Sequence, residues 1–187
     1  MCVDNIFWQN FPDCELIVIN IGARINLPNM PMNFRVINYP GGSLTDALNL
    51  GLRKASGDYI LFKGENSILP NDALDVAAHT AYTSNADVIH FAGHVRVIEN
   101  GGSLVPDDAP ELQRDRPIYL DDVAQLRAVL WLQNKLSKQI DTKIFRRDFL
   151  TDNKLTFGGD TAEFMFQALT QEEKYLLVPQ AFGLFKE

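Results

Sequence analysis

Short apolar runs alternate with longer stretches of helical periodicity in the first half of the chain. The apolar runs are rich in Val, Ile and Phe and are bounded by turn-forming residues, so they predict strands at 15–20, 34–38, 59–63 and 86–91. The longer stretches predict helices at 43–55 and 71–84. The first run reads ELIVIN, and its successive apolar residues are typical of a strand buried on both faces. With crossovers long enough for parallel pairing, this order predicts an α/β fold with a mostly parallel sheet flanked by helices.

The helix at 43–55 has clear signals for its start and its packing. It follows a Pro-Gly-Gly turn, and either Ser43 or Thr45 is placed to cap its first turn. Apolar or small residues at helical spacing form a stripe that we expect to face the sheet: Leu44, Ala47, Leu48, Gly51 and Leu52.

The second half of the chain has a less regular pattern. The segment 94–98 alternates like a strand, whereas 99–117 holds several Pro, Gly and charged residues and predicts a long surface loop. The remaining pattern predicts helices and extended segments at 121–138, 143–145, 148–153, 161–169 and 175–179. Because the part after residue 117 is too small for a core of its own, residues 1–187 are expected to form a single domain.

Composition narrows the class of protein. The chain has 187 residues, of which 46% are hydrophobic and 22% charged, as in ordinary globular domains. Its net charge of −7 argues against nucleic-acid binding, which needs a basic face. Two cysteines are too few for a disulfide scaffold or a four-ligand zinc site. No apolar run approaches the length of a membrane span and no secretory signal is visible, so a cytoplasmic protein without a transmembrane segment is expected.

Several segments, taken in order, resemble the family 2 glycosyltransferases, whose fold is called GT-A or nucleotide-diphospho-sugar transferase-like. Residues 55–62 (ASGDYILF) are similar to the family's A-G-(E/D)-Y-I-x-F run, 69–74 (LPNDAL) to its following helix start and 86–88 (ADV) to the next strand. Residues 143–150 (KIFRRDFL) resemble a later basic motif, and 155–160 lie where the family has L-x-F…E-D. The resemblance covers most of the chain. It implies a nucleotide-binding-like half at 1–98, the loop at 99–117 and an acceptor-side half at 118–187.

The family's activity is the transfer of a sugar, with inversion, from a nucleotide-diphosphate donor to an acceptor hydroxyl. The resemblance therefore implies a nucleotide sugar and a glycan acceptor as partners. It also implies Mg²⁺ or Mn²⁺ held by a D-x-D motif after the strand at 59–63, if the donor site is functional. Here Gly64 and Asn66 occupy the places of the two aspartates, and Glu65 is shifted by one position, which in an extended segment points the other way. Lys63 is a candidate to bring positive charge to a phosphate, although a solvated strand-end lysine is the plainer interpretation.

Two further parts of the family pattern are altered. Where the family has Asp-Asp-Gly-Ser after the ELIVIN strand, this chain has Asn20-Ile21-Gly22-Ala23, which leaves Asn20 as the candidate contact to the nucleoside. The leading strand that carries the family's nucleobase-binding loop has no counterpart, because the sequence opens with what resembles the first helix. We therefore expect an exposed sheet edge.

One candidate catalytic carboxylate remains. Asp160 follows Gly158-Gly159 and precedes a predicted helix, where the resemblance places the general base that takes the acceptor's proton. An Asp at this place is also a plain helix N-cap, and Glu163 one turn later fits a capping box.

The other candidates have plainer interpretations. His90 and His94 are expected to be core or rim histidines rather than a metal pair, and Asp107-Asp108 a solvated charge pair. Trp131 is placed to stack a sugar, but a helix burying its tryptophan is the commoner arrangement. Two functions stay open: a divergent glycosyltransferase, or a catalytically inactive domain of the same fold that binds a glycan, a nucleotide or a protein. Homo-oligomerisation or a protein partner also stays open.

Overall fold

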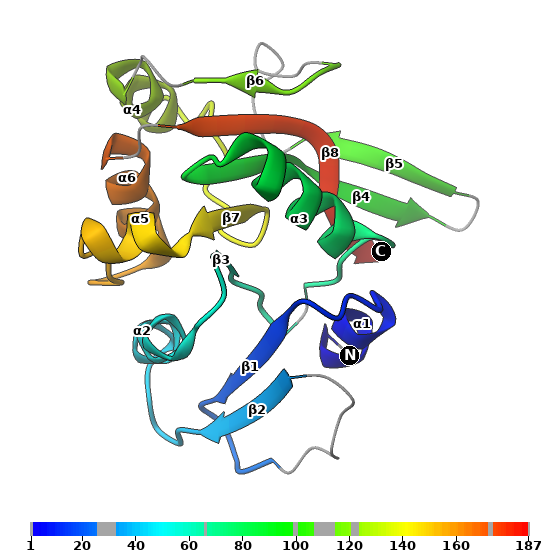
Figure 1. The fold of residues 1–187 in the computed structure, drawn as a ribbon, viewed down its shortest axis with the longest axis vertical. Coiled ribbons are helices and arrows are strands. Elements are labelled where there is room, and N and C mark those ends of the chain that lie inside the picture. Colours follow the sequence, from blue (N-terminus) through cyan, green and yellow to red (C-terminus); the bar gives the residue numbers. More distant parts are fainter. Residues whose placement is uncertain are drawn as a thin grey trace.

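A computed structural model describes residues 2–25, 33–65, 67–98, 101–106, 115–120, 124–171 and 174–186. They form six helices, α1 (Cys2–Trp8), α2 (Leu44–Lys54), α3 (Ala73–Ser84), α4 (Ala124–Leu132), α5 (Arg147–Asp152) and α6 (Thr161–Gln171). The strands are β1 (Glu15–Asn20), β2 (Asn33–Asn38), β3 (Tyr59–Leu61), β4 (Val88–Ile98), β5 (Gly101–Pro106), β6 (Ile118–Tyr119), β7 (Lys143–Arg146) and β8 (Tyr175–Lys186). Figure 1 shows them as a mixed α/β arrangement, which confirms the predicted fold class.

The larger sheet has the strand order β3-β7-β4-β8-β6, and β5 pairs with β4. Strands β4 and β8 are parallel, whereas β7 runs antiparallel to both of its neighbours, β3 and β4. Strands β5 and β6 are also antiparallel to their partners. The prediction of a mostly parallel sheet is therefore wrong in its strand directions. The reason is that β7, a four-residue segment late in the sequence, inserts between two strands from the first half.

The smaller sheet consists of β1 and β2, which pair in parallel from Glu15↔Asn33 to Asn20↔Asn38. Among the described strands, β1 has no neighbour other than β2. Every residue of β1 is only half-buried, so the expectation that ELIVIN is buried on both faces is wrong. Side chains of a strand alternate between the two faces of its sheet, so the burial of β1 depends on what covers those faces and not on its apolar composition.

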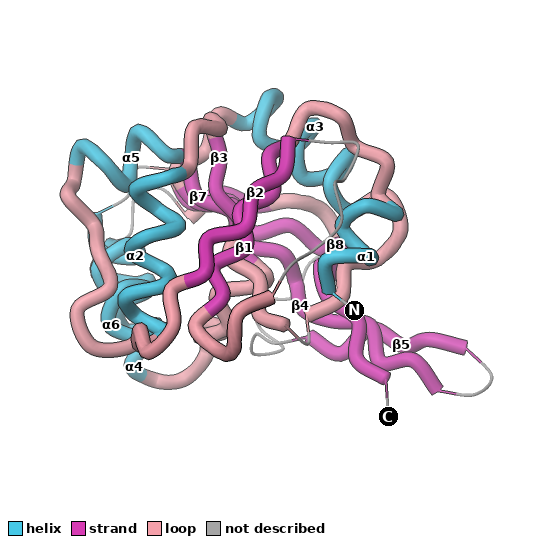
Figure 2. Tube along the Cα trace, turned by 90° about the horizontal axis from the view of Figure 1, so that it is seen from below, coloured by secondary structure: helices cyan, strands magenta, loops and turns pink. Residues whose placement is uncertain are grey.

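The core lies on both faces of the larger sheet. On one face, Phe62, Phe145, Phe157 and Phe164 form an aromatic cluster, with Phe157 and Phe164 stacked at 4.1 Å between ring centroids. On the other face, the small residues of α3 pack on the sheet: Ala73, Ala77 and Ala81. In Figure 2, α2, α4, α5 and α6 lie on one side of the strands, and α1 and α3 lie on the other. Burial of large aromatic side chains is the main source of stability that this arrangement offers.

Several predicted boundaries change because of tertiary pairing. Residues 101–106, predicted as part of a surface loop, form β5 against β4, and the stretch from 88 to 98 is one strand rather than two. Gly93, with φ of 141°, lies at the register shift of this long strand. Helix α4 ends at Leu132, earlier than the predicted residue 138. Asp107-Asp108 and residues 121–123 lie outside the described residues. No helix within the described ranges is both long enough and apolar enough to span a membrane.

Helix α2 begins as predicted, with one correction to its apolar stripe. Ser43 is the N-cap, and its hydroxyl accepts a hydrogen bond from the Asp46 backbone in a capping box. Ala47 is buried, but Leu44 is 61% exposed and does not face the sheet. The stripe packs inward only after the first residue of the helix, since Leu48 and Leu52 pack on the core whereas Leu44 meets solvent.

Candidate functional site

Polar side chains gather where β1 and β2 end, which is the edge at which α/β folds bind ligands. Asn20 and Asn38 are register partners at the ends of β1 and β2, and the Asn20 amide donates to Asn38 Oδ1 at 2.8 Å and to the Ala23 carbonyl at 2.7 Å. Asn38 in turn exchanges two hydrogen bonds with the backbone of Ile25. The pair therefore organises the 21–25 loop. The sequence predicts that the Asn20 side chain contacts a nucleoside, and in the structure its amide holds this loop.

The turn before α2 closes over the same edge. Gly41 has a φ of +80°, a left-handed conformation that favours glycine. A Cβ at Gly42 would lie 2.2 Å from the Tyr39 ring, so only glycine allows this ring to pack on the turn. Hydrogen bonds from the Ser43 hydroxyl and backbone lower the pKa of the Asp46 carboxyl. Because this carboxylate occupies the start of α2, an anion approaching the helix N-terminus would meet a negative charge.

Lys63 lies in a second cluster, after the end of β3. Its ammonium donates to the Asp141 carbonyl at 3.1 Å and lies 3.8 Å from the Asp141 carboxylate. The Ser67 hydroxyl donates to the same carboxylate at 2.6 Å, and the Phe182 ring lies beneath the ammonium at 5.8 Å. The Lys63 side chain is only 6% exposed, so it is not the solvated strand-end lysine of the plainer interpretation.

The segment that follows Lys63 does not provide a metal site. Gly64 accepts a hydrogen bond from Ser67 N in a turn, and open space surrounds the position of its missing Cβ. Glu65 is exposed, and Asn66 lies outside the described residues. Across the described part of the chain, no three His, Cys, Asp or Glu side chains gather to hold a metal ion. Hard divalent cations prefer several carboxylate oxygens, so these residues do not fit the Mg²⁺ or Mn²⁺ that the family pattern implies.

Asp160 caps helix α6. Its Oδ1 accepts a hydrogen bond from the Glu163 backbone at 2.8 Å, and Glu163 Oε2 accepts one from Gly159 N at 2.9 Å. Both carboxylates are exposed. The Asp160 bond is the N-cap bond of the capping interpretation, whereas Glu163 binds the N–H of the residue before the cap instead of closing a capping box. The Asp160 bond also fixes the orientation of the Asp160 carboxylate at the surface, which leaves a role as a base open.

Helix α2 holds the loop that carries Asp160. The Asn49 amide donates to the Phe157 carbonyl at 2.8 Å, and Phe157 N donates back to Asn49 Oδ1 at 2.9 Å. Thr45 Oγ1 donates to the Gly159 carbonyl at 3.1 Å. The structure therefore brings Asp160 to the start of α2, whereas Lys63 belongs to the separate cluster with Asp141. Sequence reasoning missed Asn38 and Asp141, since neither stands in a motif and their partners are distant in the sequence.

Replacing Asn49 with leucine is expected to destabilise the fold by about 2–4 kcal/mol. The substitution leaves the N–H and C=O of Phe157 without partners, and each unsatisfied buried polar group costs roughly 1–3 kcal/mol. Chemical denaturation measures the change, and Thr45→Val is the matched control, because it removes one exposed hydrogen bond from the same loop. A loss in Asn49→Leu no larger than that in the control contradicts the role assigned to Asn49.

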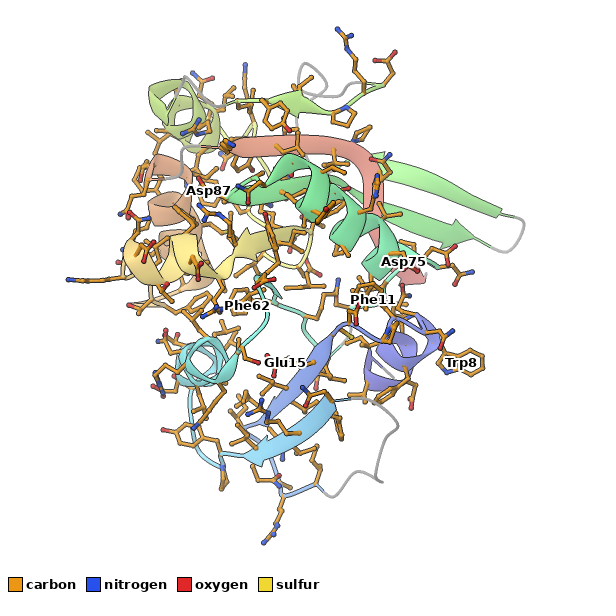
Figure 3. The ribbon with its side chains drawn as sticks, in the orientation of Figure 1. Trp8, Phe11, Glu15, Phe62, Asp75 and Asp87 are labelled. Carbon is orange, nitrogen blue, oxygen red and sulfur yellow. The ribbon has the colours of Figure 1, made fainter. Side chains whose placement is uncertain are left out.

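Glu15 joins β1 to the loop that precedes β3 (Figure 3). Its Oε1 accepts from Ser56 N at 2.5 Å, from the Ser56 hydroxyl at 2.7 Å and from Gly57 N at 3.1 Å, while Arg35 binds Oε2 at 2.9 Å. Burial alone would raise the pKa of Glu15, but these hydrogen bonds outweigh it and lower the pKa. The charged form is therefore the one that stabilises the fold.

Because the pKa of Glu15 is lowered in the folded state, its contribution to stability is present above about pH 4.3, the usual value for glutamate, and is lost as the pH falls through the lower folded value. The variant Glu15→Gln lacks this contribution. We expect its unfolding temperature to lie below that of the native sequence at pH 6 and to converge with it towards pH 3. A constant difference across this range contradicts the assignment.

His90 belongs to a buried polar layer and not to the candidate site. It is fully buried on β4, and its Nδ1 lies 2.6 Å from the Tyr175 hydroxyl. Burial, together with the nearby Lys143 charge, places the pKa of His90 well below its usual value. Trp131 is also buried, at 5% exposure, with Lys138 over its ring, so the core interpretation holds for both residues.

Comparison with known proteins places this architecture in one class. No family model matches the chain. It is 21% identical, over 201 aligned positions, to the uncharacterised glycosyltransferase EpsJ of Bacillus subtilis (strain 168), covering 100% of this chain and 56% of that protein. Among solved structures it resembles residues 1–349 of S. aureus TarS in complex with UDP-GlcNAc, with a TM-score of 0.73, 16% identity and coverage of 99% of this chain and 53% of that chain. The complex of the same protein with UDP gives a TM-score of 0.67.

The fold is therefore of the glycosyltransferase type, with a GT-A-like sheet flanked by helices. This confirms the fold that the sequence resemblance implied. The chain spans about half the length of these relatives. Their similarity establishes the fold and a glycosyltransferase-like protein, and it does not extend to the donor, the acceptor or the stereochemistry.

Proposed function

We propose that this domain binds a nucleotide sugar at the edge where β1, β2 and β3 end and transfers the sugar to an acceptor hydroxyl with inversion. The observation that carries the proposal is the likeness, over 99% of the chain, to a glycosyltransferase structure that contains UDP-GlcNAc. The donor site of this proposal comprises Asn20, Lys63, Gly64, Glu65 and Asn66. Its base is Asp160.

Transfer with inversion needs a base on the acceptor side and a way to accommodate the charge of the leaving diphosphate. Asp160 is exposed and held in one orientation by the Glu163 N–H, and it takes the acceptor's proton as the acceptor oxygen attacks the anomeric carbon. The diphosphate leaves from the opposite face of the sugar. Since the described residues do not fit a divalent ion, the positive charge in this mechanism comes from Lys63, which must exchange Asp141 for a phosphate.

The second candidate is a domain of the same fold that binds a nucleotide, a glycan or a protein without transfer. It is favoured by the Lys63–Asp141 contact, in which the nearest cation after β3 is already neutralised by a carboxylate. An ammonium in such a pair is available to a phosphate only after the pair has separated. From this arrangement we expect the domain to bind its ligand while sugar transfer is slow or absent.

Release of the nucleoside phosphate distinguishes the two candidates. The protein is incubated at high concentration with UDP-, GDP-, dTDP- and CMP-sugars and a set of glycan acceptors, with Mn²⁺ or with EDTA. Acceptor-dependent release in both conditions supports transfer without a metal. Binding of a nucleotide without any release supports the second candidate, and release only with Mn²⁺ contradicts a mechanism in which Lys63 takes the place of the metal.

A further inference from the structure

Lys63 and Ser67, at the two ends of one turn, contact the same carboxylate oxygen. The Ser67 hydroxyl donates to Asp141 Oδ2 at 2.6 Å, and the Lys63 ammonium lies 3.8 Å from the same atom. Ser67 N donates to the Gly64 carbonyl at 3.1 Å, which closes the turn between the two side chains. An ammonium and a hydroxyl that converge on one anionic oxygen form a small anion site, and its occupant here is a side chain of the protein itself.

The surroundings of Lys63 require an anion at this place. The side chain is 6% exposed, its ammonium donates to the Asp141 carbonyl at 3.1 Å, and the Phe182 ring lies 5.8 Å away, within the range of a cation–π contact. A buried ammonium is costly unless an opposite charge accompanies it. Asp141 meets this requirement in the structure, and the phosphate of a ligand would meet it equally.

A phosphate is a better partner for Lys63 than Asp141 is. The distance of 3.8 Å exceeds the roughly 2.7–2.9 Å of a charge-assisted hydrogen bond, so the carboxylate does not make the closest contact with the ammonium. A phosphate has more charge and several acceptor oxygens. Open space surrounds the position of a Cβ at Gly64, which leaves room for a ligand beside Lys63. The Asp141 side chain is already 19% exposed, so it can turn to water when it is displaced.

We propose that Asp141 is an internal placeholder for a phosphate of the ligand, and that Lys63 and Ser67 together bind this phosphate once the carboxylate has moved away. The inference rests on the donor site proposed above. It adds Ser67 as a second phosphate ligand and Asp141 as the residue that sets the affinity. Only molecules in which the carboxylate has moved bind the phosphate, so the apparent affinity is reduced by the fraction of such molecules.

Calorimetric titration with inorganic diphosphate in EDTA tests the placeholder without a nucleoside or a sugar. The native protein is compared with Asp141→Asn, which removes the charge but keeps a side-chain oxygen for the Ser67 hydroxyl and the main-chain carbonyl for Lys63. We expect the variant to bind diphosphate about 10- to 100-fold more tightly, because no carboxylate competes with the ligand. Asp141→Ala is a second variant for which the same gain is expected.

Two further variants separate the site from the net charge. Asp148→Asn removes one charge from a side chain that is 63% exposed beside Arg147, and we expect it to change the affinity at most about fivefold. Adding Ser67→Ala to Asp141→Asn removes one of the two donors, and we expect the affinity to fall about tenfold from that of Asp141→Asn. A thermal melt of each variant establishes that it is folded.

The affinities for diphosphate decide the outcome. Equal affinities in the native protein and both Asp141 variants, or no binding by any of them, overturn the inference. An equal gain in Asp148→Asn also overturns it, because the gain then reflects net charge alone.

Parallel titrations with UDP, GDP, CMP and dTDP distinguish this inference from the proposed function. Tighter diphosphate binding in the Asp141 variants, with no nucleotide bound by any protein, supports the placeholder and contradicts a nucleotide-sugar site. Nucleotide binding of equal strength in the native protein and the Asp141 variants supports the proposed function and overturns the placeholder.

Discussion

Replacing Asp160 with asparagine is expected to lower the rate of sugar transfer about 10²–10⁴-fold, the usual contribution of a general base. Asparagine has no basic carboxylate, but its side-chain oxygen still accepts the hydrogen bond from Glu163 N. Since Asn and Asp are about equally good N-caps, the free energy of unfolding is expected to change by less than about 0.5 kcal/mol. Initial rates of nucleoside-phosphate release and a denaturation curve measure the two quantities.

The variant Asp160→Ala is the matched control. It removes both the base and the cap, so it should lose the same activity and, in addition, about 1 kcal/mol of stability. The two variants thus separate the roles that the sequence left open at this position. If Asp160→Asn transfers sugar at the native rate, Asp160 is a helix cap alone and the base lies elsewhere.

Replacing Asp87 with alanine is expected to destabilise the protein by about 3 kcal/mol, the lower end of the range for breaking a buried ion pair. Asp87 is labelled in Figure 3 and lies at the start of β4, where its Oδ1 binds the Arg146 guanidinium and its Oδ2 accepts from Lys174 N at 3.0 Å. Its side chain is 4% exposed, whereas that of Arg146 is 34% exposed and is partly hydrated when left alone. The carboxylate therefore joins β7 and the start of β8 to β4.

The neighbouring pair Arg147–Asp148 provides the control. Its atoms lie 3.5 Å apart at the surface, and exposed ion pairs contribute at most about 1 kcal/mol. Asp148→Ala should therefore change the denaturation midpoint far less than Asp87→Ala. Equal losses in the two variants would show that burial does not distinguish the pairs.

The local pattern of residues was sufficient to predict many of the helices and strands. The strand at 15–20, the helix capped by Ser43 and the helix at 161–169 appear where residue spacing and capping residues predict them. These elements depend on neighbours within a few positions along the chain. The order of segments and their family resemblance were sufficient for the glycosyltransferase-type fold.

Pairing between distant segments was not predictable in the same way. Residues 101–106 have the glycine and proline content of a loop, yet β4 provides an edge along which they form a strand. The burial of ELIVIN depends on which distant segments cover the two faces of its sheet, which its own residues do not encode. The direction of β7 is also set by its neighbours rather than by its four residues.

For the candidate site too, features set by local sequence were predictable, and contacts between distant residues were not. Motif position was enough to single out Lys63 and Asp160, because each stands at the end of a predicted element. Their partners were not predictable: Asp141 is 78 positions from Lys63, and the Asn49 clamp on the Asp160 loop spans 108 positions. These long-range contacts decide whether the charged groups of Lys63 and Asp160 are available to a ligand. The chemistry of the site could therefore be derived only from the structure.

Nucleotide binding is the central claim, and a thermal-shift series with UDP, GDP, CMP and dTDP, each with Mn²⁺ or with EDTA, tests it most directly. A ligand at 100 times its Kd adds about 2.7 kcal/mol, which for a domain of this size is roughly 5–10 °C. We expect one nucleotide to give such a shift and the shift to persist in EDTA, because the described residues do not fit a divalent ion. No shift with any of the four nucleotides would contradict a donor site at this edge.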